Sequence, residues 1–211
     1  MTKKDLNQNA KFEQELINTF EPDFIFSEKP LNRFNSTKNN NNLEILNKAE
    51  KLSELKSKIN SIENCSLKNN SKNLILGDGN VNSSIMLVGE APGQEEDDSG
   101  LAFRGEVGKL LKKMLLAIQI KLENTYIAYT INFRTPEDRK PTSQEIKRYS
   151  TFLKEHISII NPKILILMGS TAMEAVTGLN NRISNERGNW KEIILKNKTY
   201  PIMITFSPSY L

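Results

Sequence analysis

Four short apolar segments, separated by segments of helical periodicity, leave this chain few architectures. The apolar segments read SSIMLVG, TYIAYTI, PKILILMG and YPIMITF, at residues 83–89, 125–131, 162–169 and 200–206. The segments between them read as helices at residues 108–120, 143–160 and 170–178. Continuous apolar strands that alternate with helices are typical of a parallel sheet covered on both faces. The sequence therefore predicts an α/β fold.

The chain divides into an arm and a domain. Residues 1–42 contain a run of asparagines and few apolar side chains, which predicts a low-complexity or disordered N-terminal arm. Residues 43–211 form the predicted domain. It opens with an amphipathic helix at residues 43–62 and continues as a sheet domain at residues 74–211.

Composition and charge limit the partners and the cellular compartment that we expect for the protein. The formal charge of +4 permits a polyanionic partner without requiring one. Cys65 is the only cysteine, which excludes a disulfide within the chain and favours a reducing compartment. No apolar run is long enough to span a bilayer, and the N-terminus is polar throughout. We therefore expect a cytoplasmic protein with no membrane partner.

The carboxyl ends of the four strands are where a site is expected, since sites in open parallel sheets form beyond those ends. These ends carry the sequences GEAPG, NFR, GST and SPS, at residues 89–93, 132–134, 169–171 and 207–209. Taken alone, GEAPG is a weak motif, because a Gly/Pro turn after a strand is usually only a turn. Taken together, in order and spacing, the four segments are far more specific.

The chain from about residue 52 to its end resembles the family-four type of bacterial uracil-DNA glycosylases. The resemblance rests on GEAPGQEEDDSGLAFRGEVGKLLKKML, YIAYTINFRTPEDRKPTSQEI, INPKILILMGSTAMEAVTG and the final YPIMITFSPSYL. It implies a three-layer α/β/α sandwich with a small central parallel sheet. It also implies a base-excision repair hydrolase, which breaks the N-glycosidic bond of a flipped-out uracil in DNA.

The resemblance assigns roles to particular residues. Glu90, or one of Glu95, Glu96 and Asp97, would position the attacking water. Phe103 would stack on the base, and Ser207 stands at the position of the donor to uracil O2. The predicted substrate-binding residues are Gly89, Ala91, Pro92, Gly93, Phe103 and Tyr129. The predicted DNA-binding residues are Arg134, Arg139, Ser170 and Ser209. The implied partner is single- or double-stranded DNA with a damaged base, bound by a monomer.

At two positions the predicted site differs from the motifs of the family that the chain resembles. The family motif His-Pro-Ser reads Ser-Pro-Ser here, so Ser207 stands where a histidine is expected. Tyr129 stands where an asparagine reads the base, and a phenol cannot copy the donor and acceptor pattern of an amide. The alternative is therefore a non-catalytic or re-specialised DNA-binding relative. The test that separates the two is whether Tyr129 fills the volume of the base.

A third departure concerns a cofactor. Many members of the family hold a four-iron cluster on four cysteines, and Cys65 matches only one of those positions. Ile62, Phe133 and Tyr149 occupy the other three. One thiolate cannot hold such a cluster, so the sequence predicts no iron–sulfur centre and no other metal site.

Each assignment has a simpler alternative. Phe103 is then an ordinary core residue, and Arg134 and Arg139 are exposed charges beside a groove. The acids at residues 95–98 form a flexible, solvated loop, which is the preferred interpretation for Glu95 and Asp98.

Overall fold

A six-stranded mixed sheet organises the part of the chain that the structure describes. The computed structural model describes residues 33–211, with side chains from residue 45 onward. The strand order is β1-β3-β2-β4-β6-β5. The strands are β1 (Gly77–Gly79), β2 (Ile85–Gly89), β3 (Tyr126–Tyr129), β4 (Ile164–Met168), β5 (Trp190–Leu195) and β6 (Lys198–Thr205).

The centre of the sheet is parallel, as the sequence predicts. Strands β3, β2, β4 and β6 pair in parallel, and each coincides with one of the four apolar segments. Both edge strands are antiparallel: β1 pairs with β3, and β5 pairs with β6. The apolar segments did not indicate these two edges, so the sheet is mixed and wider than expected.

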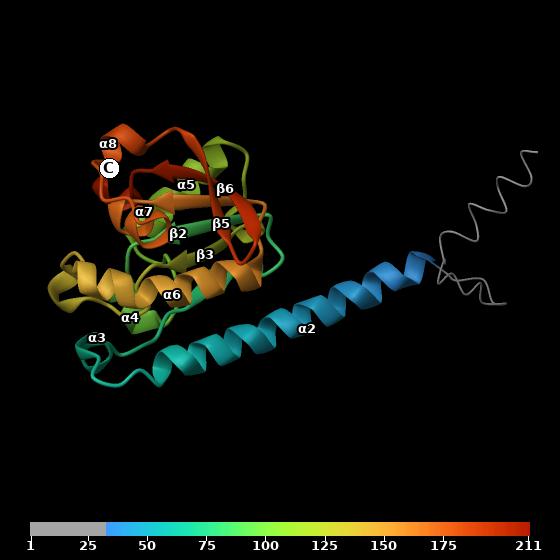
Figure 1. The fold of residues 1–211 in the computed structure, drawn as a ribbon, viewed down its shortest axis with the longest axis horizontal. Coiled ribbons are helices and arrows are strands. Elements are labelled where there is room, and N and C mark those ends of the chain that lie inside the picture. Colours follow the sequence, from blue (N-terminus) through green and yellow to red (C-terminus); the bar gives the residue numbers. More distant parts are fainter. Residues whose placement is uncertain (1–32) are drawn as a thin grey trace, which may run out of the picture. The chain divides into compact units, whose positions relative to one another are not determined.

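Helices surround the sheet (Figure 1). The α-helices are α2 (Arg33–Asn60), α3 (Ser66–Asn70), α4 (Gln94–Ser99), α5 (Glu106–Ala117), α6 (Ser143–Ile160), α7 (Ser170–Thr177) and α8 (Ile183–Glu186). The 3-10 helices are η1 (Leu122–Asn124), η2 (Pro136–Asp138) and η3 (Pro208–Tyr210). None of the helices in the described region is long and apolar enough to cross a membrane.

The two faces of the sheet form two separate cores, because successive strand residues point to opposite faces. Met86 and Val88 of β2 pack with side chains of α6 and α7 in the first core. Leu87, which lies between them, packs with Leu111 and Leu115 of α5 in the second core. Helices thus cover both faces, as in an α/β/α sandwich.

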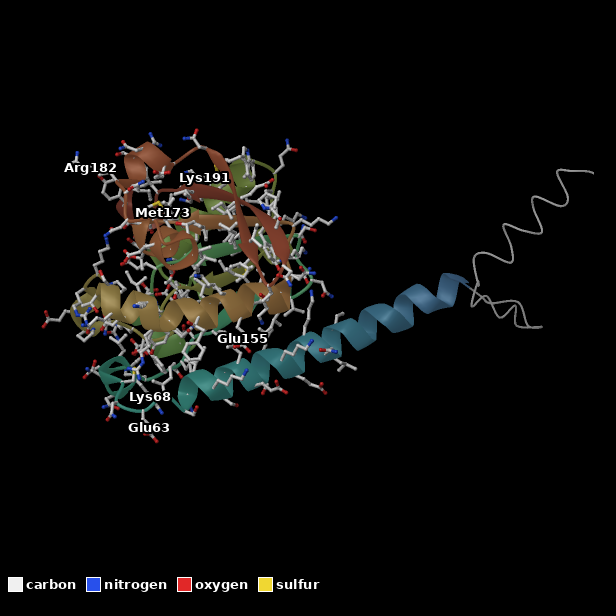
Figure 2. All side chains as sticks on the ribbon, viewed as in Figure 1. Glu63, Lys68, Glu155, Met173, Arg182 and Lys191 are labelled. Atoms are coloured by element: carbon white, nitrogen blue, oxygen red, sulfur yellow. The ribbon has the colours of Figure 1, made fainter. Side chains whose placement is uncertain are left out.

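A third apolar cluster joins α2 and α3 to the outer side of α6. Its buried members are Leu55, Ile59, Cys65, Leu67, Ile131, Phe133 and Tyr149. At the rim, Lys58 of α2 forms an ion pair of 2.7 Å with Glu155, which lies on the side of α6 that faces α2 (Figure 2). We call this cluster the third core.

Two elements differ from the sequence expectation. The helix expected at residues 43–62 begins at Arg33, so ten residues assigned to the arm, 33–42, are helical; residues 1–32 lie outside the described part. Residues 94–99, expected as a flexible acidic loop, form α4, with Glu96 and Asp97 buried. The capping box expected at α6 is present: Thr142 Oγ1 accepts a hydrogen bond from Glu145 N, and Thr142 N donates to the Glu145 carboxylate.

A candidate active site at the strand ends

The carboxyl ends of β2, β4 and β6 enclose a cleft of about 650 Å³. These strands run parallel and side by side, so the residues after them reach the same edge of the sheet. We call this space the strand-end cleft. It is lined by Glu90, Lys140, Gly169, Ser170, Asn180, Asn181, Arg182, Ile183, Ser184, Phe206, Ser207, Ser209 and Tyr210. Four of the predicted site residues, Glu90, Ser170, Ser207 and Ser209, therefore meet in one place.

Glu90 supplies the acid of the cleft. It follows β2 directly, and its Oε2 accepts a hydrogen bond from the hydroxyl of Thr171, which is fully buried in α7. This bond links the end of β2 to the first turn of α7. The half-buried carboxylate is thereby oriented toward the cleft, where it can accept a proton from a water or stabilise a nearby positive charge.

The start of α7 supplies hydrogen-bond donors and a positive charge. Gly169 has a φ of +99°, a backbone conformation that residues other than glycine rarely adopt. A Cβ at this position would lie 3.4 Å from Ser207 Cβ. Lys140 Nζ donates to Ser170 Oγ at 3.0 Å. An ammonium beside the first amides of a helix favours an anion such as a phosphate. Arg182 also lines the cleft, at the α8 end of the fold (Figure 2).

The last turn of the chain supplies hydroxyls and aromatic rings. Ser207 Oγ lies 2.7 Å from Ser209 Oγ and also accepts a hydrogen bond from Ser209 N at 3.3 Å. The centroids of the Phe206 and Tyr210 rings are 5.2 Å apart. The Arg187 guanidinium lies 4.5 Å from the centroid of the Phe206 ring. These groups are neutral donors and flat apolar surfaces, except for the arginine.

Phe103 and Tyr129 do not line this cleft; they stack on each other beside it. Their ring centroids are 4.8 Å apart and their planes differ by 8°. Tyr129 Oη accepts a hydrogen bond from Phe103 N at 3.0 Å. Both rings are buried in the second core, under α5. Burial raises the pKa of the Tyr129 phenol above its ordinary value, helped by the nearby Glu96 carboxylate.

The GEAPG turn packs tightly against this stack. A Cβ on Gly89 would lie only 2.8 Å from the Phe103 ring, so glycine is required there for close approach. Pro92 is buried, and Ala91 packs on the third core and not in the cleft. Gly93 caps α4. The turn thus holds three parts of the molecule together, and only Glu90 of this turn lines the cleft.

Glu96, one of the four acids considered for positioning the attacking water, lies outside the strand-end cleft. Its Oε2 accepts a hydrogen bond from Gly93 N at 3.0 Å, and its Oε1 accepts from Arg104 N at 2.9 Å and Gly105 N at 3.3 Å. It therefore ties the turn to the loop that carries Phe103. Three acids in the first turn, directly after a glycine, are a helix-start signal that could have revealed α4.

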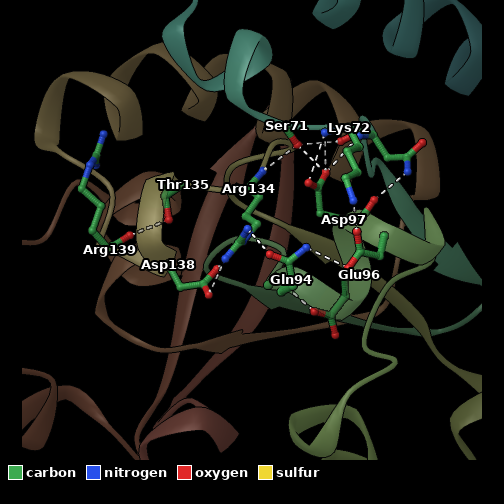
Figure 3. Close-up of polar contacts among 12 residues, drawn as sticks. Ser71, Lys72, Gln94, Glu96, Asp97, Arg134, Thr135, Asp138 and Arg139 are labelled. Atoms are coloured by element: carbon green, nitrogen blue, oxygen red, sulfur yellow. Dashed lines mark hydrogen bonds and ion pairs between the residues drawn. The ribbon is translucent and has the colours of Figure 1, made fainter.

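Asp97 joins α4 to residues 71–73 through hydrogen bonds (Figure 3). Its carboxylate accepts hydrogen bonds from Ser71 Oγ at 2.6 Å and from the backbone N–H groups of Lys72 and Asn73 at 3.0 Å. Burial by itself would raise the pKa of Asp97, but these bonds outweigh burial and hold the pKa below its ordinary value. Asp97 is therefore a structural anchor for residues 71–73.

The two arginines predicted to contact DNA are held in ion pairs. Arg134 Nε and Nη2 donate to the two oxygens of Asp138 at 2.7 and 2.9 Å, and Arg134 lies between Asp138 and Gln94 (Figure 3). Arg139 donates to both oxygens of Glu145 at 2.9 and 2.7 Å. Neither lines the strand-end cleft, so any DNA contact by them would occur outside it.

The four positions considered for an iron cluster gather in the third core. Cys65 is buried, with its Sγ 3.2 Å from Tyr149 Oη. Phe133 meets Tyr149 edge to face at 6.4 Å, and Ile62 packs on the same cluster. Only one of the four side chains is a thiolate donor. Within residues 45–211, no group of three or more His, Cys, Asp or Glu side chains is arranged to hold a metal.

His156, the only histidine of the chain, lies beside Tyr126, a member of the first core. It is buried on α6, and its Nε2 lies 2.9 Å from Tyr126 Oη. Burial lowers its pKa to about 3, so the ring is neutral at physiological pH. It cannot replace the missing histidine of the cleft, because it lies inside the core on the sheet face covered by α6 and α7.

Comparisons with known proteins place the chain in one family. Residues 76–211 match the profile of the Uracil DNA glycosylase superfamily. The chain is 38% identical over 148 residues to the Type-4 uracil-DNA glycosylase of Thermotoga maritima, covering 70% of this chain and 76% of that protein. It is 30% identical over 164 residues to the Type-4 uracil-DNA glycosylase of Archaeoglobus fulgidus, covering 76% and 82%. The corresponding protein of Sulfurisphaera tokodaii is 32% identical over 172 residues, covering 76% and 78%.

Proposed function

The chain belongs to the uracil DNA glycosylase superfamily, and we propose that it is a base-excision repair hydrolase that removes uracil from DNA. The observation that carries this proposal is the meeting of Glu90, Ser170 and Ser207 in the strand-end cleft. Glu90 is an acid that can activate water, the start of α7 can bind a phosphate, and the Ser207 hydroxyl can donate to a departing base. The substrate is a damaged base flipped out of single- or double-stranded DNA.

The reaction places opposite charges on the two fragments. As the bond breaks, the sugar becomes positive and the departing base becomes negative. The Glu90 carboxylate stabilises the sugar and takes a proton from the attacking water, while its bond to Thr171 keeps it in place. Lys140 and the first amides of α7 hold a neighbouring phosphate of the DNA, which fixes the distance between the sugar and Glu90.

Ser207 would donate to the departing base, since the family resemblance places the donor at this position. Its hydroxyl is bonded to Ser209, so it is shared and less available than a histidine side chain. A weaker donor to the leaving base costs roughly 2–4 kcal/mol of transition-state stabilisation. Uracil release should therefore be slower than in an enzyme with the histidine, by a factor on the order of a hundred or more.

One observation favours a second candidate, a non-catalytic or re-specialised DNA-binding protein. Tyr129 stacks on the ring that would hold the base, so the pocket is not open in the described state. Such a protein would bind DNA through the same cleft without releasing a base. Because the family relatives named above are glycosylases, the hydrolase remains the leading proposal.

We further propose that the protein works without the iron cluster that the family resemblance implies, as a cytoplasmic monomer. The donor set of the third core does not fit a four-iron cluster, since Ile62, Phe133 and Tyr149 supply no thiolate. These three side chains pack in the third core, at the positions where the family resemblance would place cysteines.

The decisive experiment is base release from an oligonucleotide with a single uracil, single-stranded and double-stranded. We expect slow release by the wild type and a further loss of about 10²–10⁴-fold for Glu90→Gln, which keeps the shape but cannot accept the proton. Ser207→His should speed release. The matched control is Glu192→Gln, an exposed acid on β5 that should change nothing.

Three results would decide against the proposal in different ways. If Glu90→Gln releases uracil as fast as the wild type, the acid has been wrongly assigned. If only Tyr129→Asn combined with Ser207→His releases uracil, the rest of the site is intact, but the wild-type protein no longer removes uracil. If no variant releases uracil although all bind DNA, the DNA-binding candidate replaces the hydrolase.

A further inference from the structure

The stack of Phe103 and Tyr129 has the geometry of a base held on an aromatic ring. The two planes are 8° from parallel at a centroid separation of 4.8 Å. A flipped base that used the same face of Phe103 would lie in nearly the same plane, because planar rings bind each other in offset, parallel layers. The six-membered phenol ring is also about the size of a pyrimidine.

Tyr129 is fixed in this position from three sides. Its backbone pairs with Gly89 across the sheet, and its hydroxyl accepts the Phe103 N–H at 3.0 Å. Below the stack, a Cβ on Gly89 would already collide with Phe103 and lie 3.3 Å from the Tyr129 ring. No space for another ring remains between the sheet and the stack. Tyr129 is 4% exposed, so it is not a loosely placed surface side chain.

The loop that carries Phe103 depends on the same contact. Phe103 has a φ of +52°, a left-handed conformation that is unusual for an aromatic residue. Its N–H is satisfied by the Tyr129 hydroxyl, and the next two N–H groups are satisfied by Glu96. Moving Tyr129 would therefore leave a buried donor without its partner, which opposes spontaneous opening.

We propose that Tyr129 is the specificity-determining residue of this protein: its ring occupies the place of a pyrimidine against Phe103 and must leave before a base can stack there. The inference rests on the proposed function, since it takes Phe103 as the stacking partner of the base. It goes further by stating why uracil enters the site of this chain poorly and which single side chain limits that entry.

The test measures free uracil binding by the shift of the thermal unfolding midpoint, so it requires neither DNA nor catalysis. We expect millimolar uracil to stabilise Tyr129→Ala and to leave the wild type and Tyr129→Phe unchanged. Tyr129→Phe is the matched control, because it keeps the ring and removes only the hydroxyl. Adding Phe103→Leu to Tyr129→Ala should abolish the stabilisation by uracil.

Phenol is the second probe, because it reports that the cavity exists. A folded Tyr129→Ala that binds phenol but not uracil would overturn the proposal, as would a wild type that binds uracil as well as the variant does. If Tyr129→Ala does not fold, Tyr129→Val opens most of the same space with a side chain that favours strands, and it is judged by the same results.

A DNA arm separates this inference from the proposed function. Affinity is measured for an oligonucleotide with one non-cleavable 2′-fluorodeoxyuridine and for the same oligonucleotide with cytosine. We expect Tyr129→Ala to prefer the uracil oligonucleotide by about tenfold or more, and the wild type to prefer neither. If Tyr129→Ala binds free uracil but no variant binds DNA, the proposed function fails and the assignment of Tyr129 stands.

Discussion

Glu96 illustrates how much depends on one buried side chain at this site. It is 7% exposed, and three backbone N–H groups from two separate segments converge on its carboxylate. Glu95, its neighbour on α4, is exposed. Two adjacent glutamates therefore differ completely in role, because the helix turns one of them inward.

We expect Glu96→Gln to lower the free energy of unfolding by about 1–3 kcal/mol, because an amide weakens the charge-assisted bonds and turns a donor toward N–H groups. Glu95→Gln is the matched control and should change stability by less than about 0.5 kcal/mol. Urea unfolding of the three proteins measures both. Equal effects of the two substitutions would show that Glu96 does not hold the Phe103 loop.

Individual site residues were only partly predictable. Glu90, Ser170, Ser207 and Ser209 meet as expected, because the ends of parallel strands share one edge of a sheet. The stack of Tyr129 on Phe103 depends on how two separate segments pack. No local pattern encodes that contact, so it became visible only in the structure. The ion pair of Arg139 with Glu145 is local, because it spans only the turn before α6.

Helix α6 shows a pH dependence at the scale of an element. The Arg139 guanidinium bonds lower the pKa of Glu145 to about 2; burial opposes them, and the Thr142 N–H adds to them. The folded pKa lies below the unfolded value, so the carboxylate stabilises the fold above pH 4.5. This stabilisation is lost as the pH falls toward 2.

Glu145→Gln should therefore be less stable than the wild type by about 1 kcal/mol at pH 7, since solvent screens a half-exposed pair. The difference should shrink below pH 4.5 and be lost as the pH falls through about 2. Chemical unfolding across this pH range tests it, and Arg139→Gln should show the same window because it removes the partner. A difference that is the same at pH 2 as at pH 7 would contradict the role of the charge.

Elements with strong periodicity were predicted well, and those without it were missed. The four apolar strands and helix α6 match their segments, since hydrophobic burial dictates those patterns. Strand β1 has the sequence Gly-Asp-Gly, which has no strand propensity, and it exists because β3 offers it an edge. Helix α4 is six residues long and mostly acidic, so the sequence showed no apolar period.

At the scale of the whole molecule, the third core decides whether α2 and α3 belong to the sheet domain. Phe133 comes from the end of β3, Tyr149 from α6, and Leu55 and Ile59 from α2. Because this cluster draws on segments far apart in the sequence, we expect α2 and α3 to unfold together with the sheet. The predicted boundary at residue 43 remains a prediction.

Phe133→Ala should destabilise the protein by about 3–5 kcal/mol, because it opens a cavity in the third core. Hydrogen exchange should quicken in α2 more than in β4, since α2 loses its packing surface and β4 does not. Phe152→Ala, which removes a partly buried ring from the rim, should cost clearly less. A loss below about 1 kcal/mol for Phe133→Ala would mean that the third core does not hold the molecule together.

The burial of Cys65 makes its thiol a probe for opening of the third core. It is the only thiol of the chain, it is 6% exposed, and its sulfur faces the Tyr149 hydroxyl. A thiol reagent can therefore modify the protein only when the third core opens. The labelling rate in dilute denaturant reads the frequency of that opening directly, without a mutation and independently of the strand-end cleft.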